Sequence, residues 1–168
     1  MTLSMYEVSV VVFSTRLKAL SSVLSTAEQN AGERKIDPQV FLTARLAPDM
    51  FALTRQVQIA TDHAKGAPSR LVGREVPKYE DNEASFAELQ ARIAKTLDYL
   101  ATFSAADLEG SDERIVEVRL GGREVSMAGL QYLLHLAMPN FYFHLTTAYD
   151  ILRHNGVPLG KATFLGSR

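Results

Sequence analysis

The longest apolar stretch of the chain, from Met127 to Asn155, most constrains what the chain can fold into. Pro139 lies inside this stretch, where its missing N–H frees a carbonyl and is expected to bend a helix. Ser126 is expected to cap the start of the helix, and Gly156 followed by Pro158 to end it. The hydrophobic residues recur at steps of three, four and seven, which predicts one long helix with a single apolar face: Leu130, Leu134, Ala137, Phe141, Ala148 and Leu152.

A second apolar stretch, from about Met5 to Asn30, predicts a long helix at the start of the chain. Ser4 and Glu7 form a capping box before it, and Gly32 is expected to end it. A short helix from Pro38 to Leu46 should follow. The stripe of the long helix alternates steps of four and three, the spacing of a helix that faces a bundle: Tyr6, Val10, Phe13, Leu17, Leu20, Leu24 and Ala27.

Two more long helices are predicted in the middle of the chain. One runs from about Asp49 to Leu71, and the other, opened by a capping box, from Ser85 through about Phe103. Between them Val72–Ala84 is polar, and its charged run Lys78–Glu83 is expected to be a solvated loop. Small side chains on the first of these helices either let a neighbour approach closely or leave room for a cavity. Its predicted inward stripe is Met50, Leu53, Val57, Ala60, Ala64, Ala67 and Leu71.

A β-hairpin is predicted directly before the last helix. Gly121-Gly122 joins two alternating segments, Ile115–Leu120 and Arg123–Ser126, which is typical of a two-residue hairpin turn. Because an isolated hairpin is only marginally stable, it should pack on the helices. Three long helices before the hairpin and one after it predict an all-α, up-and-down four-helix bundle with this small hairpin, in a single domain spanning residues 1–168.

Composition argues against several classes of partner and chemistry. The formal net charge is -1 and no run of Lys or Arg occurs, which disfavours nucleic acid and membrane surfaces as partners. The absence of cysteine excludes disulfides, thiolate metal sites and a cysteine nucleophile. The first residues lack the basic region and cleavage motif of a signal peptide. We therefore expect a cytoplasmic protein that binds neither nucleic acid nor membrane.

Five polar side chains are candidates for a pocket between the helices: Tyr6, Gln56, His63, Asn140 and His144. Asn140 and His144 lie four residues apart and share a helical face, and Gln56 and His63 lie seven apart on one edge of the alanine-rich stripe. A mostly apolar pocket with a few convergent polar groups is typical of a small-molecule site. The same five residues also suit a polar core cluster that sets the helix register.

Two stretches, APDMFALTRQVQIATDHAKG and HLAMPNFYFHLTTAYDILRHNGVPLG, resemble an uncharacterised family of bacterial and fungal proteins, domain of unknown function 1993. This family is similar to the DinB/YfiT-like superfamily of four-helix metalloenzymes, some of which are thiol-dependent transferases or isomerases. The resemblance covers essentially the whole chain. It implies a DinB-like protein with a polar pocket, as a metal- or thiol-dependent enzyme. The alternative is a non-catalytic small-molecule-binding or structural dimeric module.

The superfamily pattern holds a divalent metal with one His on the second helix and two His four residues apart on the last. On this chain the pattern puts His144 at the second position of the last helix and Asn140 at the first. The ligand of the second helix falls near Gln58, about one turn from His63. The resemblance thus implies a degenerate site for Zn²⁺ or Ni²⁺ with His63 and His144 as ligands, although catalytic zinc needs three protein ligands.

Three consecutive aromatic residues, Phe141, Tyr142 and Phe143, cannot all face one core. Similar members of the superfamily are often dimers, so we expect a homodimer; a single-chain mass by light scattering would contradict this. The alternative is that Tyr142 and Phe143 pack under the hairpin or the Leu46–Phe51 connection. Arg55 and Arg70 are expected at solvated positions or in salt bridges.

Overall fold

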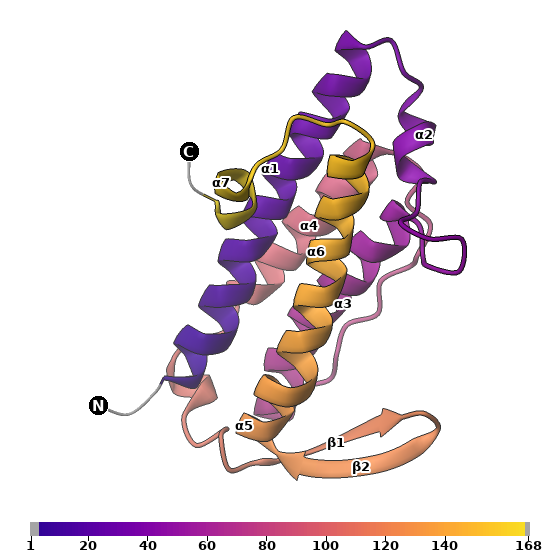
Figure 1. Ribbon diagram of the computed structural model, residues 1–168. Coiled ribbons are helices and arrows are strands. Elements are labelled where there is room, and N and C mark those ends of the chain that lie inside the picture. The colour runs from indigo at the N-terminus through magenta and orange to yellow at the C-terminus, as the bar shows by residue number, and fades with distance from the viewer. Residues whose placement is uncertain (1–3, 167–168) are drawn as a thin grey trace.

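Four long helices packed side by side dominate the computed structural model, which describes residues 4–166 (Figure 1). Helix α3 contacts α4 and α6, and α1 also contacts both. The long helices are α1 (Val12–Glu33), α3 (Leu53–Val72), α4 (Phe86–Leu100) and α6 (Met138–His154). The shorter elements are η1 (Glu7–Val11), α2 (Pro38–Leu42), η2 (Ala106–Leu108), β1 (Ile115–Leu120), β2 (Arg123–Ala128), α5 (Gly129–Tyr132), η3 (Leu133–Ala137) and α7 (Lys161–Leu165). The predicted helical architecture with a hairpin before the last long helix is confirmed.

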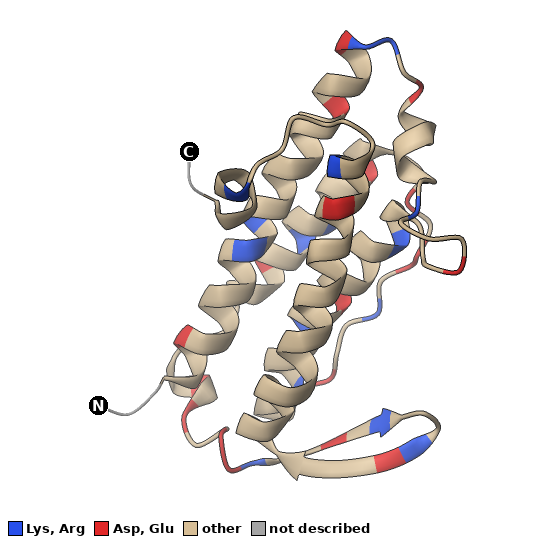
Figure 2. Cartoon of the chain, viewed as in Figure 1, with Lys and Arg blue, Asp and Glu red and all other residues tan. Residues whose placement is uncertain are grey.

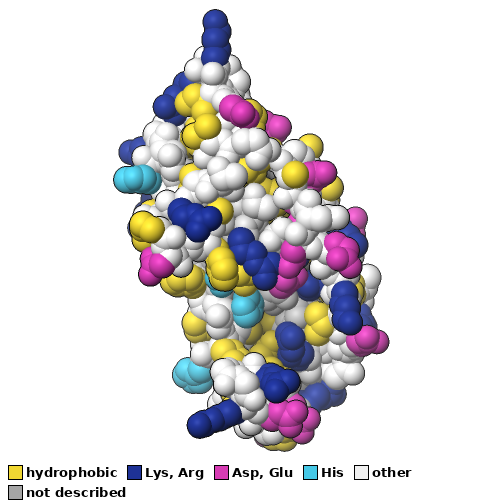
Figure 3. All heavy atoms as spheres, turned by 90° about the vertical axis from the view of Figure 1, so that its right-hand side faces the viewer, with side chains coloured by type: hydrophobic (Ala, Val, Ile, Leu, Met, Phe, Trp, Pro, Cys, Tyr) yellow, Lys and Arg dark blue, Asp and Glu magenta, His cyan; other side chains and the backbone are white. Residues whose placement is uncertain are grey.

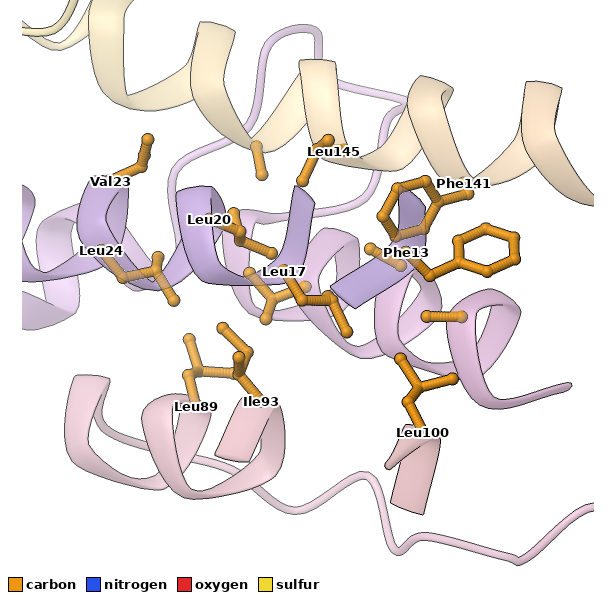
Figure 4. Packing of buried hydrophobic residues seen from close by; sticks show 14 of the residues in the cluster. Phe13, Leu17, Leu20, Val23, Leu24, Leu89, Ile93, Leu100, Phe141 and Leu145 are labelled. Carbon is orange, nitrogen blue, oxygen red and sulfur yellow. The ribbon is translucent and has the colours of Figure 1, made fainter. Parts of the chain in front are cut away.

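The core lies where the apolar stripes of α1, α4 and α6 meet (Figure 4). Phe13 and Leu17 of α1 are fully buried, as the spacing of the stripe predicts. The ring of Phe13 meets that of Phe141 edge to face, with centroids 4.9 Å apart. Leu89 of α4 and Leu145 of α6 close the same cluster. Burial of these side chains is the main favourable contribution to the fold.

By length and composition alone, the helical segment Glu7–Glu33 could cross a membrane, with a mean hydropathy of 1.3 in its most apolar window. Core helices of soluble proteins meet the same criterion. Here Phe13, Leu17 and Leu24 of this segment point into the core and are fully buried. The apolar character of the segment is therefore accounted for by packing within the chain.

The apolar face predicted for the last helix is wrong at Leu134, which is 46% exposed, whereas its neighbour Leu133 is fully buried. The cause is η3, a π-helical turn that separates α5 from α6. A π turn holds more residues than an α turn, so every side chain before it is rotated relative to the regular pattern. Pro139 follows directly, and the chain stays helical through it (Figure 1). The wider turn thus accommodates the proline.

The start of this helix also differs from the prediction. Ser126 is not its cap, because it lies in β2 and pairs with Glu117 of β1. The two strands extend to Ala128, and the helix begins only at Gly129. Both glycines of the turn have positive φ, 54° at Gly121 and 83° at Gly122, the conformation that two-residue hairpin turns require. Two more residues therefore belong to the hairpin than the sequence indicates.

Three helices are shorter at one end than predicted, and one of them, α4, ends at Leu100 rather than at about Phe103. Helix α3 begins at Leu53, so Met50 lies outside it, in the turn that follows α2. Its start carries no side-chain cap. The side-chain amide of Gln56 donates a hydrogen bond back to the carbonyl of Phe51, at 3.0 Å. Helix α2 ends at Leu42 rather than Leu46. The connection before α3 is consequently longer than expected, and it brings Phe51 next to the site described below.

The charged run of the crossover is an exposed loop, as expected, but two of its residues also bind a buried arginine. Arg92 of α4 has a side chain only 2% exposed, and it forms ion pairs with Asp81, Glu83 and Asp62 at 2.9 to 3.0 Å. It also donates to the hydroxyl of Thr61, at 2.7 Å. A buried guanidinium needs such partners to offset its desolvation, so Arg92 holds the crossover against α3 and α4.

Candidate functional site

Helices α3 and α6 bring two of the predicted histidines together. The rings of His63, on α3, and His144, on α6, are nearly parallel, with an interplanar angle of 14° and centroids 6.1 Å apart. Behind them Nδ1 of His144 lies 2.7 Å from Oε1 of Gln56. The small alanines of the α3 stripe are fully buried against neighbouring helices, and the close approach of α6 to α3 is what places these three side chains in contact.

The hydrogen bonds around Gln56 define which nitrogen of His144 carries the proton. The amide nitrogen of Gln56 donates to the carbonyl of Phe51, so its oxygen is the acceptor that faces His144. Nδ1 of His144 must then be the donor, and in the neutral ring Nε2 carries the lone pair. The exposed ring of Phe143 packs edge to face on His144, at 5.1 Å between centroids. His144 is thus a neutral, oriented imidazole.

Both histidines are neutral at physiological pH. Burial, followed by the nearby His144 and Arg70, lowers the pKa of His63 to about 4. Burial, and then the charge of Arg55, also lowers the pKa of His144. A general base works best with a pKa close to the operating pH. His63 is therefore a weak base, but a neutral ring is a good hydrogen-bond partner for a bound molecule.

His63 lines a depression of about 370 Å³ between the helices and the hairpin. The helices contribute His63, Arg70, Tyr132, Leu136 and Asn140, and the hairpin contributes Glu117, Val118, Arg119 and Leu120. Figure 3 shows that histidine, hydrophobic and basic side chains gather in a hollow on this side of the molecule. A larger hollow of about 610 Å³ lies between α1 and α7, but among residues 4–166 Lys18 is the one charged residue that lines it. The depression at His63 is the better candidate site.

Arg70 provides the charge inside this depression. Its guanidinium donates to the phenol oxygen of Tyr132, at 3.3 Å, and burial raises the pKa of that phenol, so Tyr132 stays protonated. Gly66 lies one turn earlier on α3, and a Cβ at this position would come within 2.4 Å of the Arg70 guanidinium. The absence of a side chain at Gly66 therefore lets Arg70 fold back along α3 into the depression.

The structure places the five predicted residues in two groups and leaves one apart. His63 and Asn140 line the depression, whereas Gln56 and His144 form the hydrogen-bonded pair behind it. Tyr6 lies half-buried directly before η1 and is not among the residues that line the depression. The sequence thus correctly predicts that α3 and α6 meet. The contribution of the first predicted helix, which carries Tyr6, stays a prediction.

Sequence reasoning missed Arg70, Tyr132 and the hairpin wall. Arg55 does form the expected salt bridge, with Asp81, but Arg70 has no carboxylate within salt-bridge distance among residues 4–166. A signal was present, because Arg70 follows His63 by seven residues, or two helical turns, with Gly66 between them. No spacing in the sequence relates Tyr132 or the hairpin to α3.

The donors present do not fit the three-ligand metal site that the resemblance implies. Asn140 stands where the family pattern has a histidine, and its amide donates to the carbonyl of Leu136, at 2.7 Å. His63 lies beside Arg70 and Lys65, whose charges oppose a cation, and the charge of Asp62 offsets them only in part. Within the described part of the chain, no group of three His, Cys, Asp or Glu could hold a metal ion. Two imidazoles without a third protein ligand leave such a site incomplete.

The low pKa of His63 predicts a loss of stability in acid. In the unfolded chain histidine titrates near 6.5, so between that value and about 4 the unfolded state binds more protons than the folded state. The free energy of unfolding should therefore be constant above pH 6.5 and fall as the pH decreases towards 4. Urea denaturation at a series of pH values measures this, and His63→Gln should flatten the curve. His135→Gln, at an exposed histidine that does not line the depression, is the control variant.

The arrangement of the helices and hairpin is that of a DinB-like protein. The chain matches the crystal structure of a DinB family member protein from Shewanella denitrificans with a TM-score of 0.89 and 43% sequence identity, covering 98% of this chain and 93% of that one. The family model described as "Domain of unknown function (DUF1993)" matches residues 5–165, and the chain belongs to this family. Among curated proteins, no relative matches. The resemblance noted in the sequence is thereby confirmed.

Proposed function

We propose that this protein binds a small molecule in the depression between α3, η3, α6 and the hairpin, without needing a metal. The observation that carries the proposal is the convergence of three polar groups, on His63, Arg70 and Tyr132, on one cavity of about 370 Å³. Val118, Leu120 and Leu136 supply apolar walls. Such a mixture of apolar lining and few oriented polar groups is what small-molecule sites share.

Binding is favoured over acid–base catalysis for two physical reasons. The pKa of about 4 leaves His63 too weak a base to activate a nucleophile near neutral pH. His144 is 8% exposed, and its Nδ1 is engaged with Gln56. A metal- or thiol-dependent activity remains the competing proposal, and it predicts that catalysis disappears in His144→Ala while the fold is retained.

The binding proposal can be tested by obstructing the depression. We expect small fragments to shift the NMR signals of amides that line it, in protein treated with excess EDTA. Leu120→Trp places a large ring at the hairpin wall, at a position already 38% exposed, and should abolish these shifts. Leu134→Trp is the matched control, because Leu134 is similarly exposed, at 46%, and does not line the depression. Binding that requires added Zn²⁺ or Ni²⁺, or that survives Leu120→Trp, would contradict the proposal.

The remaining expectations from the sequence are supported to different degrees. The homodimer is supported by the exposure of Phe143, at 56%, and of Leu134, and by a stretch of α6 from Met138 to Tyr149 without a charged residue (Figure 2). The up-and-down order of the four long helices is supported by the contacts of α1 and α3 with both α4 and α6. We also propose a single domain, since one hydrophobic core joins the four long helices, and a cytoplasmic location, which the absence of cysteine favours.

A further inference from the structure

We propose that the molecule bound in the depression is a small carboxylate with an apolar body, and that Arg70 is its anchor. This inference rests on the proposed function, since it names the class of ligand for the same depression. The geometry behind it is a guanidinium without an acidic partner among residues 4–166, which lies beside a phenol in a cavity that Val118, Leu120 and Leu136 also line.

The guanidinium of Arg70 has more N–H donors than it has hydrogen-bond partners among residues 4–166. It has five N–H groups, and one of them donates to Tyr132, at 3.3 Å. No carboxylate within residues 4–166 forms a salt bridge with Arg70, although Arg55, Lys65 and Arg92 each have one. The planar fork of a guanidinium matches a carboxylate with two parallel hydrogen bonds. A half-buried arginine without an acidic partner is therefore suited to an acid that arrives with the ligand.

Tyr132 adds a second donor at the same place. Its oxygen accepts from Arg70, and among the described residues its phenol makes no other hydrogen bond. Burial keeps the phenol protonated by raising its pKa, so its own hydrogen can be donated to the oxygen of a bound molecule. Asn140 turns its amide nitrogen to the helix carbonyl of Leu136. Its side-chain oxygen is left as an acceptor for a polar group elsewhere on the ligand.

The charge inside the depression favours a single negative charge. His63 is neutral near pH 7, so Arg70 is the cation that the helices contribute to the lining. On the hairpin Glu117 and Arg119 are exposed and carry opposite charges, which largely offset each other at the mouth. One guanidinium balances one carboxylate, whereas a phosphate dianion would need more positive charge. The apolar walls at Val118 and Leu136 then suit the body of the acid.

The position of Arg70 depends on Gly66, which allows a test that removes no charge. A methyl group on residue 66 would approach the Arg70 guanidinium to 2.4 Å, so Gly66→Ala should push this flexible side chain out of the depression. Alanine is favoured over glycine within a helix, and the variant should therefore be at least as stable as the parent. If this variant loses ligand binding but keeps its stability, damage to the fold cannot be the cause of the lost binding.

The experiment compares benzoate with its neutral isostere benzamide by NMR titration of the intact chain. We expect both to shift the amides of His63 and Tyr132, with the Kd of benzoate lower by about tenfold, because charge-assisted hydrogen bonds are stronger than neutral ones. Arg70→Gln should remove the advantage of benzoate and leave benzamide binding unchanged. In the same variant the pKa of His63 should rise, since the charge of Arg70 lowers it. Gly66→Ala should weaken benzoate binding in the same way.

The possible failures are distinguishable. If neither compound shifts these amides, both the proposed function and this inference are overturned. If benzamide binds as tightly as benzoate, small molecules do bind but the carboxylate assignment is overturned. An equal loss of benzoate binding in Arg119→Gln would place the anion at the mouth of the depression and overturn the role of Arg70. Tighter binding of phenyl phosphate than of benzoate would overturn the choice of a monoanion.

Discussion

Replacing Gly129 by alanine is expected to destabilise the protein strongly. An ideal Cβ at this position would lie 1.9 Å from the carbonyl oxygen of Ser111 and 2.9 Å from a methyl group of Leu71. Neither neighbour can move away easily, because the first is a backbone atom and both Ser111 and Leu71 are fully buried. The backbone here is also fixed by the adjacent N–H of Leu130, which donates to the carbonyl of Asp112, at 2.9 Å. We expect a loss of about 3 kcal/mol in the free energy of unfolding, the upper end for overpacking.

Urea denaturation of Gly129→Ala and Gly32→Ala together measures this effect. Gly32 lies in α1, and a Cβ there would meet nothing within 4 Å. Relief of the conformational entropy of glycine in a helix should make Gly32→Ala more stable by about 0.5 kcal/mol. Equal stabilities of the two variants would show that the start of α5 does not need the close approach to Ser111.

Replacing Arg92 by methionine is expected to release the crossover between α3 and α4. The methionine keeps most of the buried volume but leaves Glu83, only 10% exposed, without its cation. Breaking one side of a buried ion pair costs about 3 to 5 kcal/mol. We expect about 3 kcal/mol here, because Asp62 and Asp81 are more exposed and keep Lys65 and Arg55 as partners. Hydrogen exchange of the crossover amides should also become faster.

Lys95→Met is the matched control for this variant. Lys95 lies one turn from Arg92 on α4, and its ammonium lies 4.2 Å from the centroid of the Tyr79 ring, which Arg92 also approaches, at 5.4 Å. Lys95 is exposed, and a cation–π contact at an exposed site contributes at most about 1 kcal/mol. A loss in Lys95→Met as large as that in Arg92→Met would mean that contact with Tyr79, and not the buried ion pairs, holds the crossover.

The helices and the hairpin could be predicted because their patterns are local. The stripe from Val10 to Ala27 and the paired glycines at 121 and 122 each determine the backbone of their own neighbourhood. The errors occur where an irregular turn or strand pairing overrides the simple periodic pattern. Leu134 faces solvent because a π turn rotates the helix, and Ser126 became a strand residue because β1 offered it a partner.

The candidate site could be predicted only in part, for a related reason. His63 and His144 lie on apolar helical faces, and two such faces bury best against each other, so their meeting was foreseeable. Arg70 was not foreseen, because whether an arginine on the edge of a helix finds a carboxylate depends on which elements fold beside it. At Arg55 and Arg92 the crossover supplies the acid, whereas at Arg70 the neighbour is the hairpin and Tyr132.

By itself the sequence determined the helical periods, the hairpin turn and the two histidines that share the α3–α6 contact, since each follows from spacing along the chain. The family followed from the resemblance of two stretches to known sequences. Only the tertiary structure decided which polar groups are satisfied within the chain. Gln56 binds His144 across the α3–α6 contact and Arg92 binds Glu83 of the crossover, whereas Arg70 lies against a phenol beside a cavity. The physical reason is that a buried charge or amide is satisfied by whatever long-range packing places next to it, which residue spacing does not specify.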